Sequence, residues 1–91
     1  MDLELEGRTC LVTGASKGIG RGTAKVLAAE GCRVAVLARR KNLLEELAGE
    51  IEDLGHERPL VIDEDVTAKG ASEKIRKRVL DPFGHLDILV N

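Results

Sequence analysis

The sequence contains no tryptophan or tyrosine, only one phenylalanine and only two prolines. Its core must therefore be built from leucine, valine, isoleucine and alanine. Without a tyrosine, the sequence has no phenol to act as a general acid or base. The 91 residues carry a net charge of −2, so there is no excess of basic charge to attract nucleic acid or an acidic membrane surface. We therefore expect one small domain over residues 1–91, with neither nucleic acid nor membrane as a partner.

Long apolar runs are also absent, and the amino-terminal segment 1–6 is acidic rather than apolar. No run is long enough to span a bilayer, and this segment lacks the apolar region of a secretory signal. Cys10 and Cys32 lie inside short apolar runs and not at the spacing of metal ligands. Such residues are typical of reduced, buried thiols. Together these features predict a cytoplasmic protein.

Other charged or metal-ligating residues predict no additional site. His56 and His85 each lie beside a glycine with no third ligand at metal spacing, so we predict no metal site. The acidic residues 63–65 are typical of a strand end that leads into a helix. The four basic residues in the segment 74–78 have no aromatic residues among them, which favours a solvated helix face over nucleic-acid binding.

Short apolar segments predict four β-strands, and amphipathic segments between them predict three helices. The predicted strands are residues 9–13, 33–38, 60–62 and 86–90. The order βαβαβαβ is typical of a Rossmann-type α/β fold, in which a doubly wound parallel sheet has helices on both faces. The fourth strand is apolar up to Asn91, with no turn or covering helix after it. We therefore expect the domain to be partial and truncated after the fourth strand.

Glycine, proline and capping residues predict where the helices begin and end. Gly31 predicts that the first helix ends there in the left-handed conformation, and Gly55 predicts the end of the second helix. Pro82 predicts that the third helix stops before it. Asn42 is the predicted N-cap of the second helix, with Glu45 as its capping-box partner.

A glycine-rich loop follows the first strand. Gly14, Gly18 and Gly20 have the spacing G-x-x-x-G-x-G, which allows a sharp exit from the strand and a close backbone approach to a ligand. The loop leads into a helix, whose free amides and dipole favour an anion such as pyrophosphate. The spacing differs from the G-x-x-x-x-G-K-[ST] motif of ATPases and GTPases. It therefore indicates a dinucleotide site.

The end of the second strand predicts which dinucleotide is bound. In many such folds an acidic residue about 20 positions beyond the glycine loop binds the ribose 2′-OH of NAD. Ala38 stands there instead, so no carboxylate repels a 2′-phosphate, and the guanidinium of Arg39 is placed to grip it. Lys17 adds a second positive charge. NADP is the predicted cofactor; the alternative is that Arg39, Arg40 and Lys41 form only a solvated charge cluster.

Three segments resemble the classical short-chain dehydrogenase/reductase family, with the 3-oxoacyl-(acyl-carrier-protein) reductases as the nearest type. They are residues 13–20, 65–66 and 87–91, and the resemblance covers essentially the whole chain. It implies that the glycine loop wraps the adenosine ribose and pyrophosphate, and that Asp65 and Val66 meet the adenine. It also implies that Asn91 begins an Asn-Asn-Ala-Gly motif and holds the sheet together, and that basic residues at positions 17 and 39 mark a preference for NADP. The predicted cofactor-binding residues are Gly14, Ala15, Ser16, Lys17, Gly18, Ile19, Gly20, Arg39, Asp65, Val66 and Asn91.

The resemblance implies reduction of a carbonyl by hydride transfer, with catalytic Ser, Tyr and Lys residues located beyond the fourth strand. None can be assigned in this sequence, where Ser16 and Ser72 are the only serines and tyrosine is absent. We therefore expect the cofactor-binding amino-terminal part of an NADP-dependent oxidoreductase that reduces a ketone or a 3-oxoacyl substrate. The 91 residues alone are predicted to be inactive.

Two alternatives to this interpretation remain. One is a stand-alone, non-catalytic nucleotide-binding or assembly module. The other is a proteolysed or engineered fragment that pairs through the uncovered edge of its fourth strand, because such an edge offers unpaired backbone groups to another chain. We expect self-association through this edge or a homo-oligomer, with a small carbonyl compound as the substrate of the whole protein.

Overall fold

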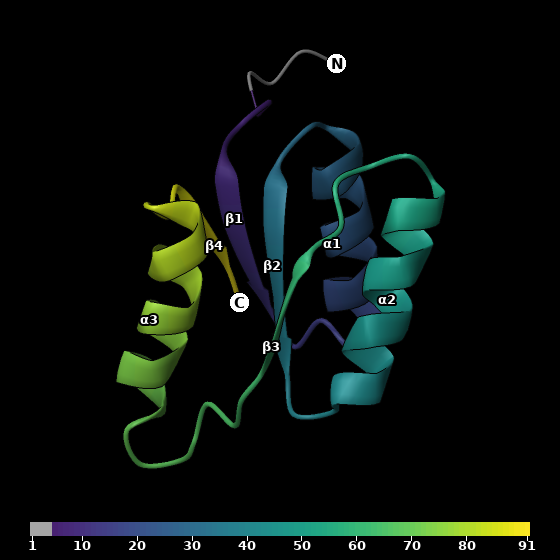
Figure 1. Ribbon diagram of the computed structural model, residues 1–91. Helices are drawn as coiled ribbons and strands as arrows, with labels where there is room; N and C mark the ends of the chain where they lie inside the picture. Colours follow the sequence, from purple (N-terminus) through teal and green to yellow (C-terminus); the bar gives the residue numbers. More distant parts are fainter. Residues whose placement is uncertain (1–4) are drawn as a thin grey trace.

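The computed structural model describes residues 5–91, and residues 1–4 of the acidic amino terminus lie outside the described part. It shows one parallel sheet with helices on both faces (Figure 1). The elements are β1 (Thr9–Thr13), α1 (Gly18–Ala29), β2 (Arg33–Ala38), α2 (Lys41–Asp53), β3 (Leu60–Asp63), α3 (Ala71–Phe83) and β4 (Ile88–Val90). The strand order is β3-β2-β1-β4, which confirms the Rossmann-type α/β prediction. No helix in residues 5–91 has the length and apolarity needed to cross a membrane.

Each face of the sheet is covered by its own helices. Helices α1 and α2 lie on one face, and α3 lies on the other (Figure 1). Successive side chains of a strand point to opposite faces, so each strand contributes to two cores. The core under α1 and α2 includes Cys10, Val12, Val34, Val36, Leu44, Leu47 and Ile51. The core under α3 includes Leu11, Ala35, Leu37, Ile62, Val79 and Phe83. Burial on both faces explains why β1 and β2 are almost continuously apolar.

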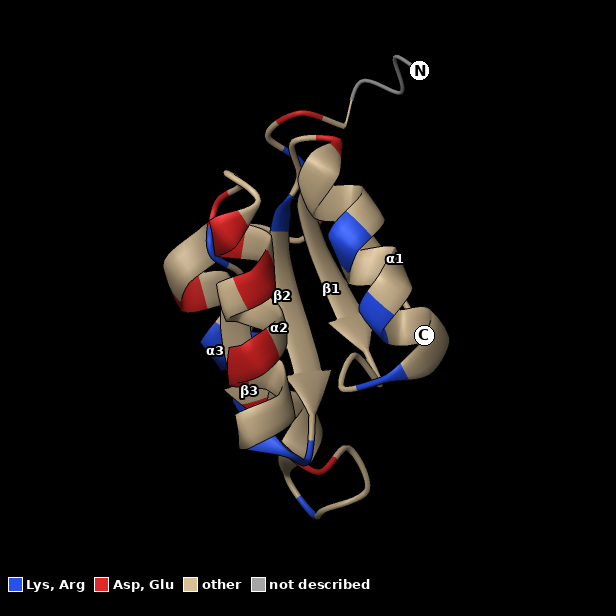
Figure 2. Cartoon of the chain, turned by 90° about the vertical axis from the view of Figure 1, so that its right-hand side faces the viewer, with Lys and Arg blue, Asp and Glu red and all other residues tan. Residues whose placement is uncertain are grey.

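Opposite charges connect α1 to α2 along their outer surfaces. Figure 2 shows basic residues along α1 and acidic residues along α2. Arg21 forms ion pairs with Glu46 and Glu50, and the Lys25 ammonium lies 3.6 Å from a Glu50 carboxylate oxygen. An ion pair this close to solvent contributes only about 0 to 1 kcal/mol to stability. Side-chain packing, rather than these pairs, therefore determines the arrangement of the two helices.

The glycine caps of the first two helices are confirmed. Gly31 and Gly55 have φ angles of 90° and 91°, in the left-handed region. The amide of Gly31 donates to the Ala28 carbonyl at 3.0 Å, and the amide of Cys32 donates to the Leu27 carbonyl at 3.1 Å. This is the bond pattern of a Schellman cap. It allows β2 to begin two residues after Gly31.

The predicted start of α2 is wrong. The helix begins at Lys41, with Arg40 at the N-cap and no side-chain cap, so Asn42 lies inside the first turn. The Leu44 amide donates to the Arg40 carbonyl at 3.2 Å and closes that turn. Glu45 pairs with Arg58 instead of forming a capping box.

The predicted end of α3 and start of β4 are also wrong. Helix α3 passes through Pro82 and ends at Phe83, because the Phe83 ring is buried against the sheet and lies 4.8 Å from the Arg33 guanidinium. Gly84 then ends the helix with a φ of 81°. Strand β4 begins at Ile88 rather than at residue 86, because its pairing with β1 begins at Ile88, opposite Cys10.

Both cysteines are free and buried, as predicted. Burial raises the pKa of the Cys10 thiol to about 12, and its hydrogen bond with Cys32 adds to the effect. A thiol with such a high pKa stays protonated at neutral pH and is a poor nucleophile. Cys10 and Cys32 therefore serve as small apolar residues of the core.

Candidate nucleotide-binding site

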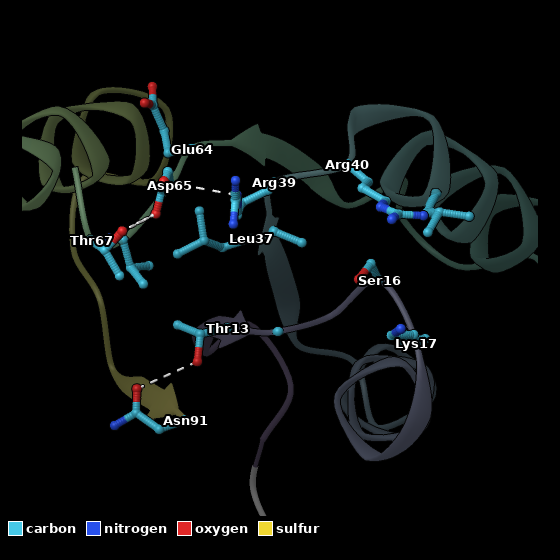
Figure 3. Close-up of a pocket in the computed structure, with 14 residues that line it drawn as sticks. Thr13, Ser16, Lys17, Leu37, Arg39, Arg40, Glu64, Asp65, Thr67 and Asn91 are labelled. Atoms are coloured by element: carbon cyan, nitrogen blue, oxygen red, sulfur yellow. Dashed lines mark hydrogen bonds and ion pairs between the residues drawn. The ribbon is translucent and has the colours of Figure 1, made fainter.

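A pocket of about 670 Å³ lies at the carboxyl ends of the strands. Its lining comes from the segments that follow all four strands: 13–17, 37–43, 64–67 and Asn91 (Figure 3). In open parallel sheets, ligands bind outside this edge, near the point where the strand order reverses. That point lies at β1, whose neighbours β2 and β4 lead in opposite directions.

Most of the predicted cofactor residues meet at this pocket. Those that line it are Gly14, Ser16, Lys17, Arg39, Asp65, Val66 and Asn91. Ala15 is buried beneath the loop, and its amide donates to the Leu37 carbonyl at 3.1 Å, which ties the loop to β2. Gly18, Ile19 and Gly20 form the first turn of α1, with the Ile19 side chain exposed to solvent.

The three glycines of the loop serve different physical needs. Gly14 and Gly18 have φ angles of 62° and 64°, where other residues are strained. A Cβ added to either would meet no atom of the described residues within 4 Å, so the space beside the loop is open to a ligand. A Cβ on Gly20 would lie 2.4 Å from the Gly14 carbonyl oxygen, so Gly20 allows α1 to start directly against the loop.

The amino end of α1 provides hydrogen-bond donors at the pocket. Lys17 is its N-cap residue in an extended conformation, and within residues 5–91 no side-chain hydrogen bond caps the helix. The first amides of a helix have no partner within the helix, and with the helix dipole they favour an anion. The exposed Lys17 lies on the same loop. Figure 3 shows Arg39 and Arg40 across the pocket from Ser16 and Lys17.

Arg39 and Asp65 face each other over the pocket. The Arg39 side chain is 78% exposed, and its Nε lies 3.8 Å from Asp65 Oδ2. Asp65 Oδ1 accepts hydrogen bonds from the Thr67 hydroxyl at 2.6 Å and the Thr67 amide at 2.9 Å. These bonds hold the pKa of Asp65 below its usual value. Asp65 is therefore fixed and ionised, while Arg39 is held only by a weak, solvated pair and remains available to a ligand.

Asn91 and Thr13 connect the ends of β4 and β1 at the base of the pocket. The Thr13 hydroxyl is 3.2 Å from the Val90 carbonyl oxygen and 3.4 Å from Asn91 Oδ1. The hydroxyl can donate to either oxygen. Both contacts keep the two strand ends together beside the glycine loop.

Sequence analysis did not assign several pocket residues to the site. They are Thr13, Leu37, Ala38, Arg40, Leu43, Glu64 and Thr67. For Thr67 a signal existed, because an Asp two residues before a Thr is typical of a turn closed by the Asp side chain. The sequence names Arg40 only in the alternative of a solvated charge cluster, whereas the structure places it at the pocket, at the N-cap of α2. Leu43 and Glu64 carry no local signal.

The fold is a Rossmann-type α/β arrangement with a pocket at the carboxyl ends of its strands. The sequence profile of the short chain dehydrogenase family matches residues 8–91, so the chain belongs to that family. A short chain dehydrogenase of Pseudocercospora fijiensis is 43% identical, over 97% of this chain and 28% of its own length. The 3-oxoacyl-[acyl-carrier-protein] reductase of Thermotoga maritima is 37% identical, over 98% of this chain and 36% of its own. The chain thus spans about a third of the length of these relatives.

Solved structures of this family share the fold closely. The citronellol catabolism dehydrogenase of Pseudomonas aeruginosa superposes with a TM-score of 0.91 at 36% identity, over 96% of this chain and 36% of that one. A short chain dehydrogenase of Burkholderia cenocepacia, solved in complex with NADP, gives a TM-score of 0.85 at 41% identity, over the same two shares. Family and fold are therefore as the sequence resemblance predicted.

Proposed function

We propose that this chain is the cofactor-binding part of an NADP-dependent oxidoreductase that reduces a ketone or a 3-oxoacyl substrate. The observation that carries the proposal is the charge at the pocket rim. The end of β2 presents Ala38 in place of a carboxylate, and Arg39 and Lys17 line the same pocket. A ribose 2′-phosphate would meet two cations there and no fixed acid at the end of β2.

The remaining residues fit the other parts of the nucleotide. The open side of Gly14 and the uncapped amides of α1 would hold the pyrophosphate, and Asp65 with Val66 would border the adenine. The related Burkholderia cenocepacia dehydrogenase, solved with NADP, supports the choice of ligand. When bound, the nicotinamide supplies a hydride for carbonyl reduction, and this chain's own residues bind and orient the adenosine half.

Proton delivery to the carbonyl needs an acid that these residues do not supply. The sequence has no tyrosine, and Ser16 belongs to the cofactor loop. We therefore propose that the 91-residue polypeptide alone does not reduce carbonyl compounds. Measurable NADPH oxidation by purified polypeptide of verified mass, with ketone substrates, would overturn this.

Cofactor choice can be tested by titrating NADPH and NADH against the unmodified chain and against Arg39→Ala. The chain has no tryptophan or tyrosine, so nicotinamide fluorescence can be followed with little background. Loss of the charged phosphate contact should weaken NADPH binding by about 1.5 to 3 kcal/mol and leave NADH binding nearly unchanged. Arg58→Ala is the control, because Arg58 precedes β3 at the other end of the sheet. Equal affinity of the unmodified chain for both cofactors would contradict the proposal.

We also propose that copies of the chain associate through the outer edge of β4. Within the described residues β4 pairs only with β1, which leaves backbone groups on its other side without a strand partner. Beside this edge, Leu86, Leu89, Ile75 and Leu80 line a second, apolar hollow of about 450 Å³. An exposed edge next to apolar surface favours pairing with another strand.

A further inference from the structure

Arg78 of α3 forms hydrogen bonds to three residues at the end of β3: Val61, Asp63 and Glu64. One of its terminal nitrogens donates to the Val61 carbonyl at 3.2 Å and to Asp63 Oδ1 at 3.0 Å. The other donates to Glu64 Oε2 at 3.0 Å. The planar guanidinium thus holds two carboxylates and a backbone carbonyl of β3 at once, which is the geometry that its fork of donors allows.

The two carboxylates that Arg78 holds belong to a run of three. Asp63, Glu64 and Asp65 are consecutive, and both Glu64 and Asp65 line the nucleotide pocket. Arg39, the cation proposed for the 2′-phosphate, already lies near Asp65. A second free carboxylate at this rim would attract Arg39 and repel a phosphate.

Figure 3 shows how the two pocket carboxylates differ. Asp65 is directed toward Arg39, whereas the Glu64 carboxylate points away from it. The Glu64 side chain is turned toward Arg78 on the α3 side of the sheet, and it is largely covered there. Hydrogen bonding to Arg78 also lowers the pKa of Asp63, so Asp63 stays ionised and paired.

We propose that Arg78 is a positioning residue for cofactor selectivity: by binding Glu64 and Asp63 it keeps the Glu64 charge away from Arg39 and the 2′-phosphate. The inference rests on the proposed NADP site. Arg78 does not line that pocket, so it acts only through the carboxylates that it holds. Removal of Arg78 should release Glu64 toward the rim and penalise the cofactor that carries the extra phosphate.

The experiment compares affinities for NADPH and NADH in Arg78→Met. NADPH binding should weaken by about fivefold to tenfold, as expected for one additional nearby charge in partly screened surroundings, and NADH binding by less than about twofold. Arg58→Met is the matched control. Arg58 also pairs with two carboxylates, Glu45 and Glu52, and its side chain is 41% exposed against 38% for Arg78. It should leave both affinities unchanged.

A second substitution separates charge placement from simple loss of structure. Adding Glu64→Gln to Arg78→Met removes the released charge, and NADPH affinity should return to within about twofold of the unmodified chain. Arg78→Lys keeps the charge without the fork and should give an intermediate selectivity. Thermal melts of each variant, with and without cofactor, report folding separately.

The possible outcomes are distinct. If the unmodified chain does not bind NADPH, the proposed function itself fails. If the unmodified chain binds NADPH, two results for Arg78→Met would contradict the selectivity role of Arg78. One is an equal loss of affinity for NADPH and NADH, and the other is no loss of affinity for either. The same holds if Glu64→Gln fails to restore NADPH binding in the Arg78→Met chain. Only a selective loss that Glu64→Gln reverses supports the inference.

Discussion

The carboxylate of Asp87, just before β4, accepts a hydrogen bond from the amide of Thr9 at the start of β1, with Asp87 Oδ2 at 2.9 Å from the nitrogen. The same oxygen lies 3.2 Å from the Thr9 hydroxyl and 3.1 Å from His85 Nε2. Thr9 is completely buried. This contact joins strands that are 78 positions apart in sequence, at the end of the sheet opposite the pocket.

Stability should therefore depend on the ionisation of Asp87. The Thr9 amide bond, with His85 and Arg8 nearby, holds the pKa of Asp87 below its usual value. The unfolded chain then binds the proton more readily, so this stabilisation is complete above about pH 4 and is lost as pH falls through the lower folded-state pKa. Urea unfolding from pH 7 to pH 3 should show the difference between the unmodified chain and Asp87→Asn shrinking as pH falls.

Asp53→Asn is the control for this pH series, since Asp53 at the end of α2 has no ion pair within residues 5–91. It should give nearly the same pH profile as the unmodified chain. Asp63 and Asp65 also have lowered pKa values and contribute to acid sensitivity in all three proteins. A difference between Asp87→Asn and the unmodified chain that stays constant with pH would contradict the prediction.

Substitution of two glycines of α1 by alanine should change the stability of the chain in opposite directions. In Gly20→Ala the new methyl would be 2.4 Å from the Gly14 carbonyl oxygen, so the loop or helix must shift, at a cost of about 1 to 3 kcal/mol. In Gly22→Ala it would meet nothing within 4 Å, and helix propensity should stabilise the chain by about 1 kcal/mol. Chemical denaturation of both variants tests this. Equal effects would show that the close approach at Gly20 does not constrain the loop.

Ala38→Asp should reverse the proposed preference for NADPH over NADH. A carboxylate at the end of β2 would accept a hydrogen bond from the ribose 2′-OH of NADH and repel the 2′-phosphate of NADPH. We expect NADPH affinity to fall by at least about tenfold and NADH affinity to rise by about threefold to tenfold. Ala38→Asn has nearly the same size without the charge and should leave NADPH better bound than Ala38→Asp does. An unchanged affinity ratio in Ala38→Asp would place the 2′-phosphate away from this strand end.

Much of the fold could be predicted because local and tertiary preferences agree. Strands β1 and β2 have the predicted bounds, since each is a short, mainly apolar run that is followed by a glycine or a charged residue. The predictions failed where tertiary contacts overrode a local signal. Burial of Phe83 carries α3 past Pro82, and Glu45 pairs with Arg58 instead of forming a capping box with Asn42.

For the candidate site too, local sequence signals could be read and tertiary contacts could not. That the glycine loop and Arg39 lie at the pocket could be predicted from spacing, because segments that follow parallel strands meet at one edge of the sheet. The contact of Arg78 with Glu64 could not, since it depends on how α3 packs beside β3 across 14 positions of sequence. No periodicity or motif encodes such a pairing between a helix and a strand end.

Self-association should be weakened by a charge placed beside the open strand. The Leu89 side chain in β4 is 55% exposed and borders the apolar hollow next to α3. Leu89→Lys should shift sedimentation toward the monomer at a given concentration, because a charge beside an edge strand opposes pairing with a second copy. Val26→Lys is the control, since Val26 is similarly exposed, at 61%, but lies on α1 over the other face of the sheet. If the unmodified chain sediments as a monomer at high concentration, β4 does not recruit a second copy. If both lysine variants dissociate the chain equally, general surface hydrophobicity rather than the β4 edge drives association.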